Sequence, residues 1–197
     1  MQPSIFLALT LSLLSTVTSF IVPSNQDDGI YPVHRSPSSD ETHTLHSSPS
    51  PLRRADEPLI PNLVSAIGEV ARLAQWGQTH CMCGVRLSHE DTDAAVNDLK
   101  SQLGTDGKIM KPQEAYYSIK SSVVAYVCNM DGNAPLKAWA AIVNGCTGKI
   151  SEACGNYMAG DTGGITGMAV GYVPYEDGAK FCDEALMSGA DRCDDAQ

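Results

Sequence analysis

One short stretch of this chain carries side chains that could do covalent chemistry. Residues 80–86 read His-Cys-Met-Cys-Gly-Val-Arg. A cysteine thiolate is a strong nucleophile, and an arginine a few residues later can hold the oxygens of a phosphoryl group. In this interpretation Cys81 attacks phosphorus, Arg86 binds the oxygens, and an acid such as Asp91 or Asp93 protonates the leaving group.

The stretch resembles the loop of the protein tyrosine phosphatases, in which His-Cys is followed by five residues and an arginine. Here only four residues separate Cys81 from Arg86. A loop shorter by one residue changes the arrangement of the backbone N–H groups that would hold the phosphoryl oxygens. We favour the alternative, a disulfide-bonded strand with Arg86 on its surface. A zinc site at His80, Cys81 and Cys83 is disfavoured because this Cys-x-Cys has no matching second pair, so we expect no metal and no cofactor.

All the cysteines lie after residue 80. They number seven, and in an oxidising compartment they predict a disulfide framework with one cysteine left over: Cys81, Cys83, Cys128, Cys146, Cys154, Cys182 and Cys193. In a strand, Cys81 and Cys83 point to the same face, so we expect them to bond two different partners. The pairing stays open. Cys193 is the predicted free cysteine; the alternative is that it ties the tail to the body.

The N-terminal part of the chain has the features of targeting and processing segments. An apolar block of about ten residues predicts a signal peptide over residues 1–19, cleaved after Ser19. Residues 20–54 are rich in Pro and Ser with little apolar periodicity, so we expect a disordered pro-segment. The segment ends in Arg53 and Arg54, a dibasic site for a processing protease or, alternatively, a basic pair in a linker. We therefore expect a secreted protein.

Charge excludes two classes of partner. The chain has a formal net charge of −10 at pH 7, which repels phosphate backbones and anionic lipid heads. No second hydrophobic segment is long enough to span a membrane. We expect no nucleic acid and no membrane partner, and a monomer.

The elements that must position residues 80–86 follow from periodicity and turn residues. Residues 55–79 are expected to form an N-terminal helix, residues 80–187 a disulfide-stabilised domain, and residues 188–197 a polar tail. Within the domain we expect these elements in order: a strand at 81–87, a helix from the Ser88 cap to 103, a hairpin of strands 115–119 and 123–128, a helix from Pro135 to 157, and a strand at 165–173. This order predicts an α+β fold of the split βαβ type, with an antiparallel sheet and two helices on one face.

The layout resembles the α/β sandwiches of the fungal killer toxins of the KP4 and KP6 types. Short pieces also resemble small secreted fungal proteins, many regarded as effectors: Cys83-Gly84, HEDTDAA at 89–95, VAYVCN at 124–129, ACG at 153–155 and VGY at 170–172. The resemblance covers about half of the chain. It implies the fold and the cysteine positions and transfers no catalytic residue.

Three functions are compatible with these features. The first, which we favour, is a secreted effector that binds a host protein and modulates plant or other host immunity, through exposed loops such as 105–112 and 159–164. The second is a cysteine-dependent phosphatase delivered into host cells, where reducing conditions free Cys81. The third is a killer-toxin-like antimicrobial protein; such toxins commonly depend on basic residues, so the acidic net charge opposes it.

Overall fold

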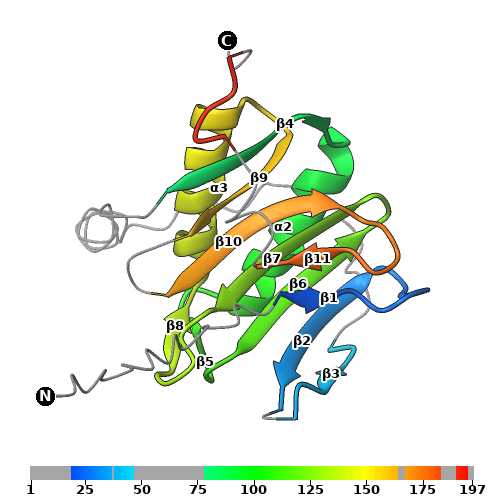
Figure 1. The fold of residues 1–197 in the computed structure, drawn as a ribbon, viewed down its shortest axis with the longest axis vertical. Coiled ribbons are helices and arrows are strands. Elements are labelled where there is room, and N and C mark those ends of the chain that lie inside the picture. The colour runs from blue at the N-terminus through cyan, green and yellow to red at the C-terminus, as the bar shows by residue number, and fades with distance from the viewer. Residues whose placement is uncertain (1–18, 37, 47–77, 164–166, 183–189, 195–197) are drawn as a thin grey trace, which may run out of the picture.

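The computed structural model describes residues 19–36, 38–46, 78–163, 167–182 and 190–194. Its centre is a seven-stranded antiparallel sheet with the strand order β3-β2-β6-β7-β10-β9-β4 (Figure 1). These strands are β2 (Gly29–Arg35), β3 (Glu41–His43), β4 (Thr79–Arg86), β6 (Glu114–Lys120), β7 (Val123–Asn129), β9 (Met158–Gly163) and β10 (Met168–Pro174). Two small ribbons pair β1 (Phe20–Ile21) with β11 (Lys180–Phe181) and β5 (Lys108–Met110) with β8 (Leu136–Ala138).

The first helix, α2 (His89–Leu103), forms where the sequence predicts it. The Ser88 hydroxyl caps its start by accepting a hydrogen bond from the Asp91 backbone N–H at 3.3 Å. Acidic residues occupy the first turn, where the positive end of the helix dipole stabilises their negative charge. Gly104 ends the helix.

The second helix, α3 (Ala140–Cys154), starts later than the sequence predicts. Pro135 was expected in its first turn, but the next three residues form β8, and the helix begins after Trp139. Gly145 and Gly148 do not break it. Its inward face, which carries residues such as Val143 and Ile150, packs on the sheet and stabilises the helix as a whole.

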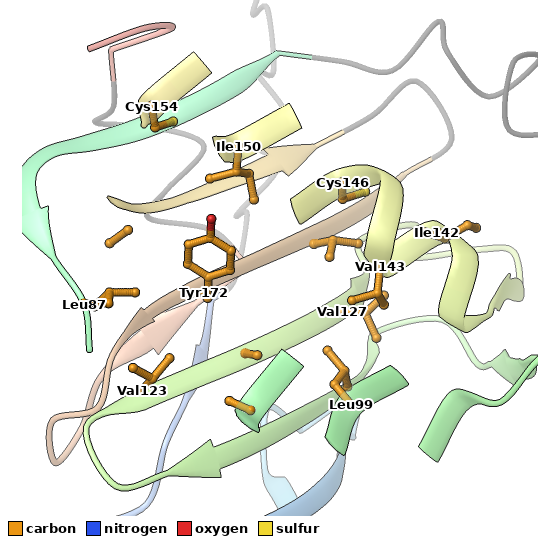
Figure 2. Close-up of a cluster of buried hydrophobic side chains, with 14 of the residues drawn as sticks. Leu87, Leu99, Val123, Val127, Ile142, Val143, Cys146, Ile150, Cys154 and Tyr172 are labelled. Carbon is orange, nitrogen blue, oxygen red and sulfur yellow. The ribbon is translucent and has the colours of Figure 1, made fainter. Parts of the chain in front are cut away.

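Strand β7 is buried on both sides and separates two hydrophobic cores. Val123, Ala125 and Val127 face the core beneath α2 and α3, whose side chains are drawn in Figure 2. Val124 and Tyr126, at the alternate positions, face a second core on the other side of the sheet. The result is an α+β fold stapled by disulfides, with an antiparallel sheet and both helices on one face, as the sequence predicts.

The second core is aromatic and is covered by the ribbon of β1 and β11. Phe20 and Phe181 stack at 5.7 Å between ring centroids, and Tyr31 stacks on Tyr117 at 5.2 Å. Tyr126 completes the cluster from β7 at 5.2 Å from Phe181. Residues 20–33 therefore supply four of the buried side chains of this core: Phe20, Val22, Tyr31 and Val33.

The prediction of disorder for residues 20–54 is wrong for the part that the structure describes. Residues 20–46, apart from residue 37, contain β1, β2 and β3, and β2 pairs with β6 from Gly29↔Ile119 to His34↔Glu114. The prolines and the polar composition suggested disorder, but the sequence Ile-Tyr-Pro-Val supplies enough apolar surface once β6 lies beside it. Pro32 has no N–H to donate to a neighbouring strand, but its carbonyl oxygen still accepts a hydrogen bond from Thr44 N–H at 3.3 Å.

Other predicted segments lie partly or wholly outside the described residues. These are residues 1–18 of the predicted signal peptide, the dibasic pair Arg53 and Arg54, residues 55–77 of the predicted N-terminal helix, and residues 183–187 of the domain. Thr79, at the end of that predicted helix, begins β4 instead. Asp161-Thr162-Gly163, expected in an exposed turn, form the buried end of β9, so loop 159–164 is not an exposed loop where it is described.

Candidate functional site

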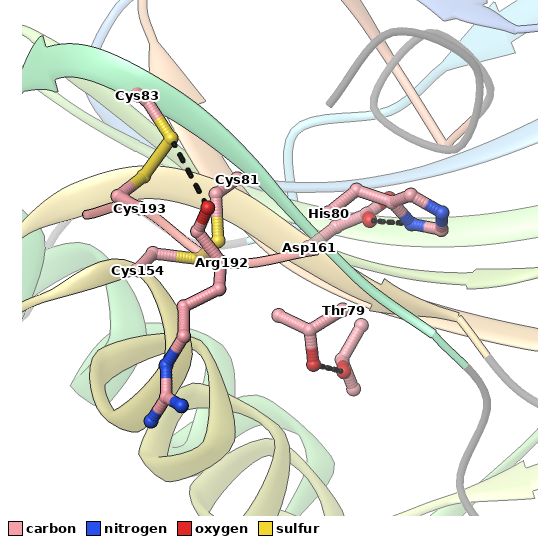
Figure 3. Close-up of a disulfide and its surroundings, with 9 residues drawn as sticks. Thr79, His80, Cys81, Cys83, Cys154, Asp161, Arg192 and Cys193 are labelled. Atoms are coloured by element: carbon pink, nitrogen blue, oxygen red, sulfur yellow. Dashed lines mark hydrogen bonds and ion pairs between the residues drawn. A yellow bond between two sulfur atoms is a disulfide. The ribbon is translucent and has the colours of Figure 1, made fainter. Parts of the chain in front are cut away.

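Strand β4 holds the cysteines that sequence analysis singled out, and both are bonded. Cys81 is linked to Cys154 at the end of α3, with a Cα–Cα distance of 5.3 Å, and Cys83 to Cys193, at 5.6 Å (Figure 3). The prediction that Cys81 and Cys83 bond two different partners is confirmed. The edge strand is thereby tied to the helix behind it and to the C-terminal stretch of the chain.

The unpaired cysteine is Cys146 and not Cys193, so the prediction for Cys193 is wrong. The C-terminal stretch folds back along β4, where Cys81 N–H donates to the Ala190 carbonyl oxygen at 2.7 Å, and this places Cys193 beside Cys83. The third bridge joins Cys128 to Cys182. The alternative in which Cys193 ties the tail to the body is therefore the arrangement found.

Cys146 projects from α3 into the core beneath the helices and is 2% exposed. Cys146 was expected in a disulfide, because Cys193 was the predicted free cysteine. Burial raises the pKa of its thiol far above the usual range, so the thiol stays protonated at neutral pH. A buried, protonated thiol is a poor nucleophile.

The three residues of the phosphatase interpretation do not form a catalytic site in this structure. Cys81 is 2% exposed and its sulfur is bonded to Cys154. Arg86 is exposed at the end of the same strand, past an irregularity in the pairing with β9. The Asp91 carboxylate accepts hydrogen bonds from the backbone N–H and hydroxyl of Ser122, at 3.3 and 2.6 Å, which joins α2 to the β6–β7 turn.

Two charged or titratable side chains meet beneath β4 and β9. His80 Nδ1 lies 3.3 Å from Oδ1 of Asp161, whose side chain is fully buried (Figure 3). Burial raises the pKa of the Asp161 carboxyl to about 6, while His80 opposes the shift. A Cβ at Gly171 would come within 2.6 Å of Asp161 Cβ and of the Tyr126 hydroxyl oxygen. Only glycine at this position therefore leaves room for the side chains of Asp161 and Tyr126.

The ribbon of β5 and β8 carries a strongly exposed hydrophobic side chain. Ile109 is 69% exposed, the highest value among the large hydrophobic residues described. It lies directly opposite the exposed Lys137, and Lys111 is exposed two residues further on. Loop 105–112 was predicted as a binding loop, but Lys137 was missed because residues 136–138 were assigned to a helix.

Buried contacts hold this ribbon in one position. The side-chain amide of Asn129, at the end of β7, donates to the carbonyl oxygens of Met110, Lys111 and Ala134, at 3.3, 2.9 and 2.9 Å. Met110 is fully buried, and Lys108 Nζ lies 5.3 Å from the centre of the Tyr116 ring. The ribbon therefore presents a small apolar and basic surface on a rigid base.

The comparisons give no relative for this arrangement: no protein-family model, curated protein or solved structure matches the chain. Within the part of the chain that the structure describes, no group of three or more His, Cys, Asp or Glu side chains is placed to hold a metal ion. Over the same residues, no helix is long and apolar enough to cross a membrane.

Proposed function

We propose that this protein is a secreted, disulfide-stabilised effector that binds a host protein and modulates host immunity. Three disulfides in a small acidic chain support secretion, because such bonds form and persist in oxidising compartments. Binding is favoured over catalysis because the cysteine that would serve as nucleophile is bonded to Cys154.

The observation that carries the proposal is the outward face of the β5–β8 ribbon. On a chain with a net charge of −10, Ile109, Lys111 and Lys137 form an apolar centre with two lysines beside it. Binding surfaces commonly combine an apolar anchor with charges that steer the partner. The partner that fits is a host-protein segment in which acidic side chains flank an apolar one.

The test compares the intact protein with a ribbon variant in host tissue. Plant leaf tissue is treated with the purified protein, with the double variant Ile109→Asp/Lys137→Glu, or with Leu45→Asp, and a defence reaction is then triggered. We expect the intact protein and Leu45→Asp to alter the reaction and the double variant to lose at least about 90% of that effect. Such a loss corresponds to an affinity for the host protein that is lower by about tenfold or more, or about 1.4 kcal/mol. Leu45 is the matched control because it is also exposed, at 50%, outside the ribbon.

Two results count against the proposal. If the intact protein has no effect on host tissue, the effector function is wrong. If the double variant is as active as the intact protein while both remain folded, the ribbon is not the binding surface. The same preparations are assayed for phosphatase activity with and without reductant, and turnover that Cys81→Ser abolishes would make the protein an enzyme.

A further inference from the structure

The N-terminal segment, residues 19–46, behaves in this structure as a bound partner of the rest of the fold. The segment contributes β1, β2 and β3, and β2 lies between β3 and β6 in the sheet. No cysteine precedes Cys81 in the sequence, so no disulfide can join this segment to the rest of the chain. The peptide chain between residue 46 and β4 is its only covalent connection.

We propose that the edge of β6 and the aromatic core beside it form a strand-acceptor site whose occupant is residues 20–46, the part of the segment that follows the predicted cleavage after Ser19. We further propose that this segment stays bound after hydrolysis of the chain at the dibasic pair Arg53-Arg54. The processed protein is then a two-chain molecule without a covalent link between its chains. This inference does not depend on the proposed effector function.

Backbone pairing provides the first part of the attachment. Strands β2 and β6 are antiparallel partners over six residue pairs, and β3 extends the sheet on the outer side of β2. If the segment left, the N–H and C=O groups along that edge of β6 would lose their partners. An unpaired edge of this length promotes association with other chains, so the bound state is favoured.

Buried apolar side chains provide the second part. Phe20, Val22, Tyr31 and Val33 are each at most 5% exposed, and all four belong to the aromatic core. Removing the segment would open that core to water, with the rings of Tyr117 and Phe181 losing their stacking partners. Strand addition with side chains in pockets is a general way in which proteins bind extended segments.

Polar contacts provide the third part and set the register. The Tyr117 hydroxyl donates to Gln26 Oε1 at 2.5 Å, and the Tyr175 hydroxyl donates to the Gln26 carbonyl oxygen at 3.2 Å. In the turn between β6 and β7, Ser121 N–H donates to the carboxylate of Asp28 at 2.8 Å. These bonds cross from the segment to the body of the fold, so each would be broken when the segment leaves.

The experiment cuts the full chain and asks whether the two pieces separate. Arg53-Arg54 is replaced by the recognition sequence of a site-specific protease, the purified protein is cut to completion, and the products are run on size-exclusion chromatography and native mass spectrometry. We expect one peak that contains both fragments in a 1:1 ratio, and two fragments only after denaturation. The uncut protein with the same replacement is the reference.

A pair of adjacent residues supplies the matched variants. Phe20 is 2% exposed and Ile21 is 45% exposed, although both are large, apolar and part of β1. In the cut protein, Phe20→Ala is expected to weaken retention of the fragment by about tenfold or more, and Ile21→Ala by less than about threefold. Retention is measured as the fraction of fragment that remains after extensive dilution.

The inference is overturned if the N-terminal fragment elutes alone from the cut, unmutated protein under native conditions. Equal retention of the Phe20→Ala and Ile21→Ala fragments would also overturn it, since the buried core would then contribute nothing. Where Phe20→Ala fails to fold, Tyr31→Phe is used instead; it keeps the stacked ring and removes the hydroxyl, which donates to the Asp27 carbonyl oxygen within the segment. The proposal expects its retention to lie close to that of the unmutated fragment, and its loss would contradict the proposal.

Discussion

The two edges of the seven-stranded sheet are closed in different ways. At one edge, β4 is bonded to α3 and to the C-terminal stretch through the disulfides of Cys81 and Cys83. At the other edge, β2 and β3 have no cysteine and are held by strand pairing, aromatic packing and the ion pair of Arg35 with Glu41. The covalent edge resists cutting of the chain, whereas the other edge resists reductant, so each has its own point of failure.

The largest expected effect comes from removing the buried disulfide between Cys81 and Cys154. The double variant Cys81→Ala/Cys154→Ala is expected to lower the free energy of unfolding by about 2–5 kcal/mol, because the bridge closes a long loop and its sulfurs lie in the core. Chemical denaturation measures the loss. Hydrogen exchange should accelerate in β4 and remain nearly unchanged in β2; equal acceleration at both edges would show that the edges are not independent.

The second effect is a pH dependence at the covalent edge. The carboxyl of Asp161 has a pKa of about 6 in the folded protein and about 4 when unfolded, so the folded state binds more protons between these values. Its contribution to stability is therefore present below about pH 4 and is lost as the pH rises through 6, by up to about 3 kcal/mol. Asp161→Asn removes this dependence.

Unfolding free energies of the intact protein and of Asp161→Asn at pH 4, 5, 6 and 7 test this prediction. The advantage of the intact protein over the variant should shrink across that range. Glu176→Gln, a change to an exposed carboxylate, serves as the control and should leave the pH profile unchanged. A profile of Asp161→Asn parallel to that of the intact protein would contradict the assignment.

Local signals explain which elements could be predicted from the sequence. The β6–β7 hairpin and α2 are specified by residues close together: a two-residue turn between apolar runs in one case, and Ser88 with an acidic first turn in the other. Strand β2 has its partner in β6, 80 to 90 residues later in the chain, and it has a proline in its middle. The composition of residues 20–54 therefore indicated disorder, because composition contains no information about a distant strand such as β6 that can pair with the segment.

The candidate site was only partly predictable for the same reason. Residues 80–86 could be recognised as a strand that bonds two partners, but the return of the C-terminal stretch to β4 decides that Cys193 is paired and Cys146 is not. Likewise, the exposure of Ile109 depends on Asn129, which fixes the ribbon from a neighbouring strand. The residues within 80–86 or within the β5–β8 ribbon do not by themselves predict these long-range contacts.

The smallest expected effect compares one arginine from each edge. Arg35 is 7% exposed, pairs with Glu41, donates to the Ser19 carbonyl oxygen and lies 4.7 Å above the Phe20 ring, so it joins the ends of the N-terminal segment. Arg35→Ala is expected to lower the free energy of unfolding by about 2 kcal/mol, the usual size of a lost hydrogen bond to a charged group together with a partner left in a partly buried site.

Arg86→Ala removes the same side chain from the exposed end of β4 and is expected to change that free energy by less than about 0.5 kcal/mol. Thermal and denaturant unfolding of both variants measure the difference. The Arg35→Ala loss should fall when Glu41→Gln is added, because the partly buried side chain at position 41 then no longer carries a charge that has lost its guanidinium partner. Equal effects for the two arginines would mean that the ion pair adds nothing to the edge without disulfides, and that strand pairing and aromatic packing hold it alone.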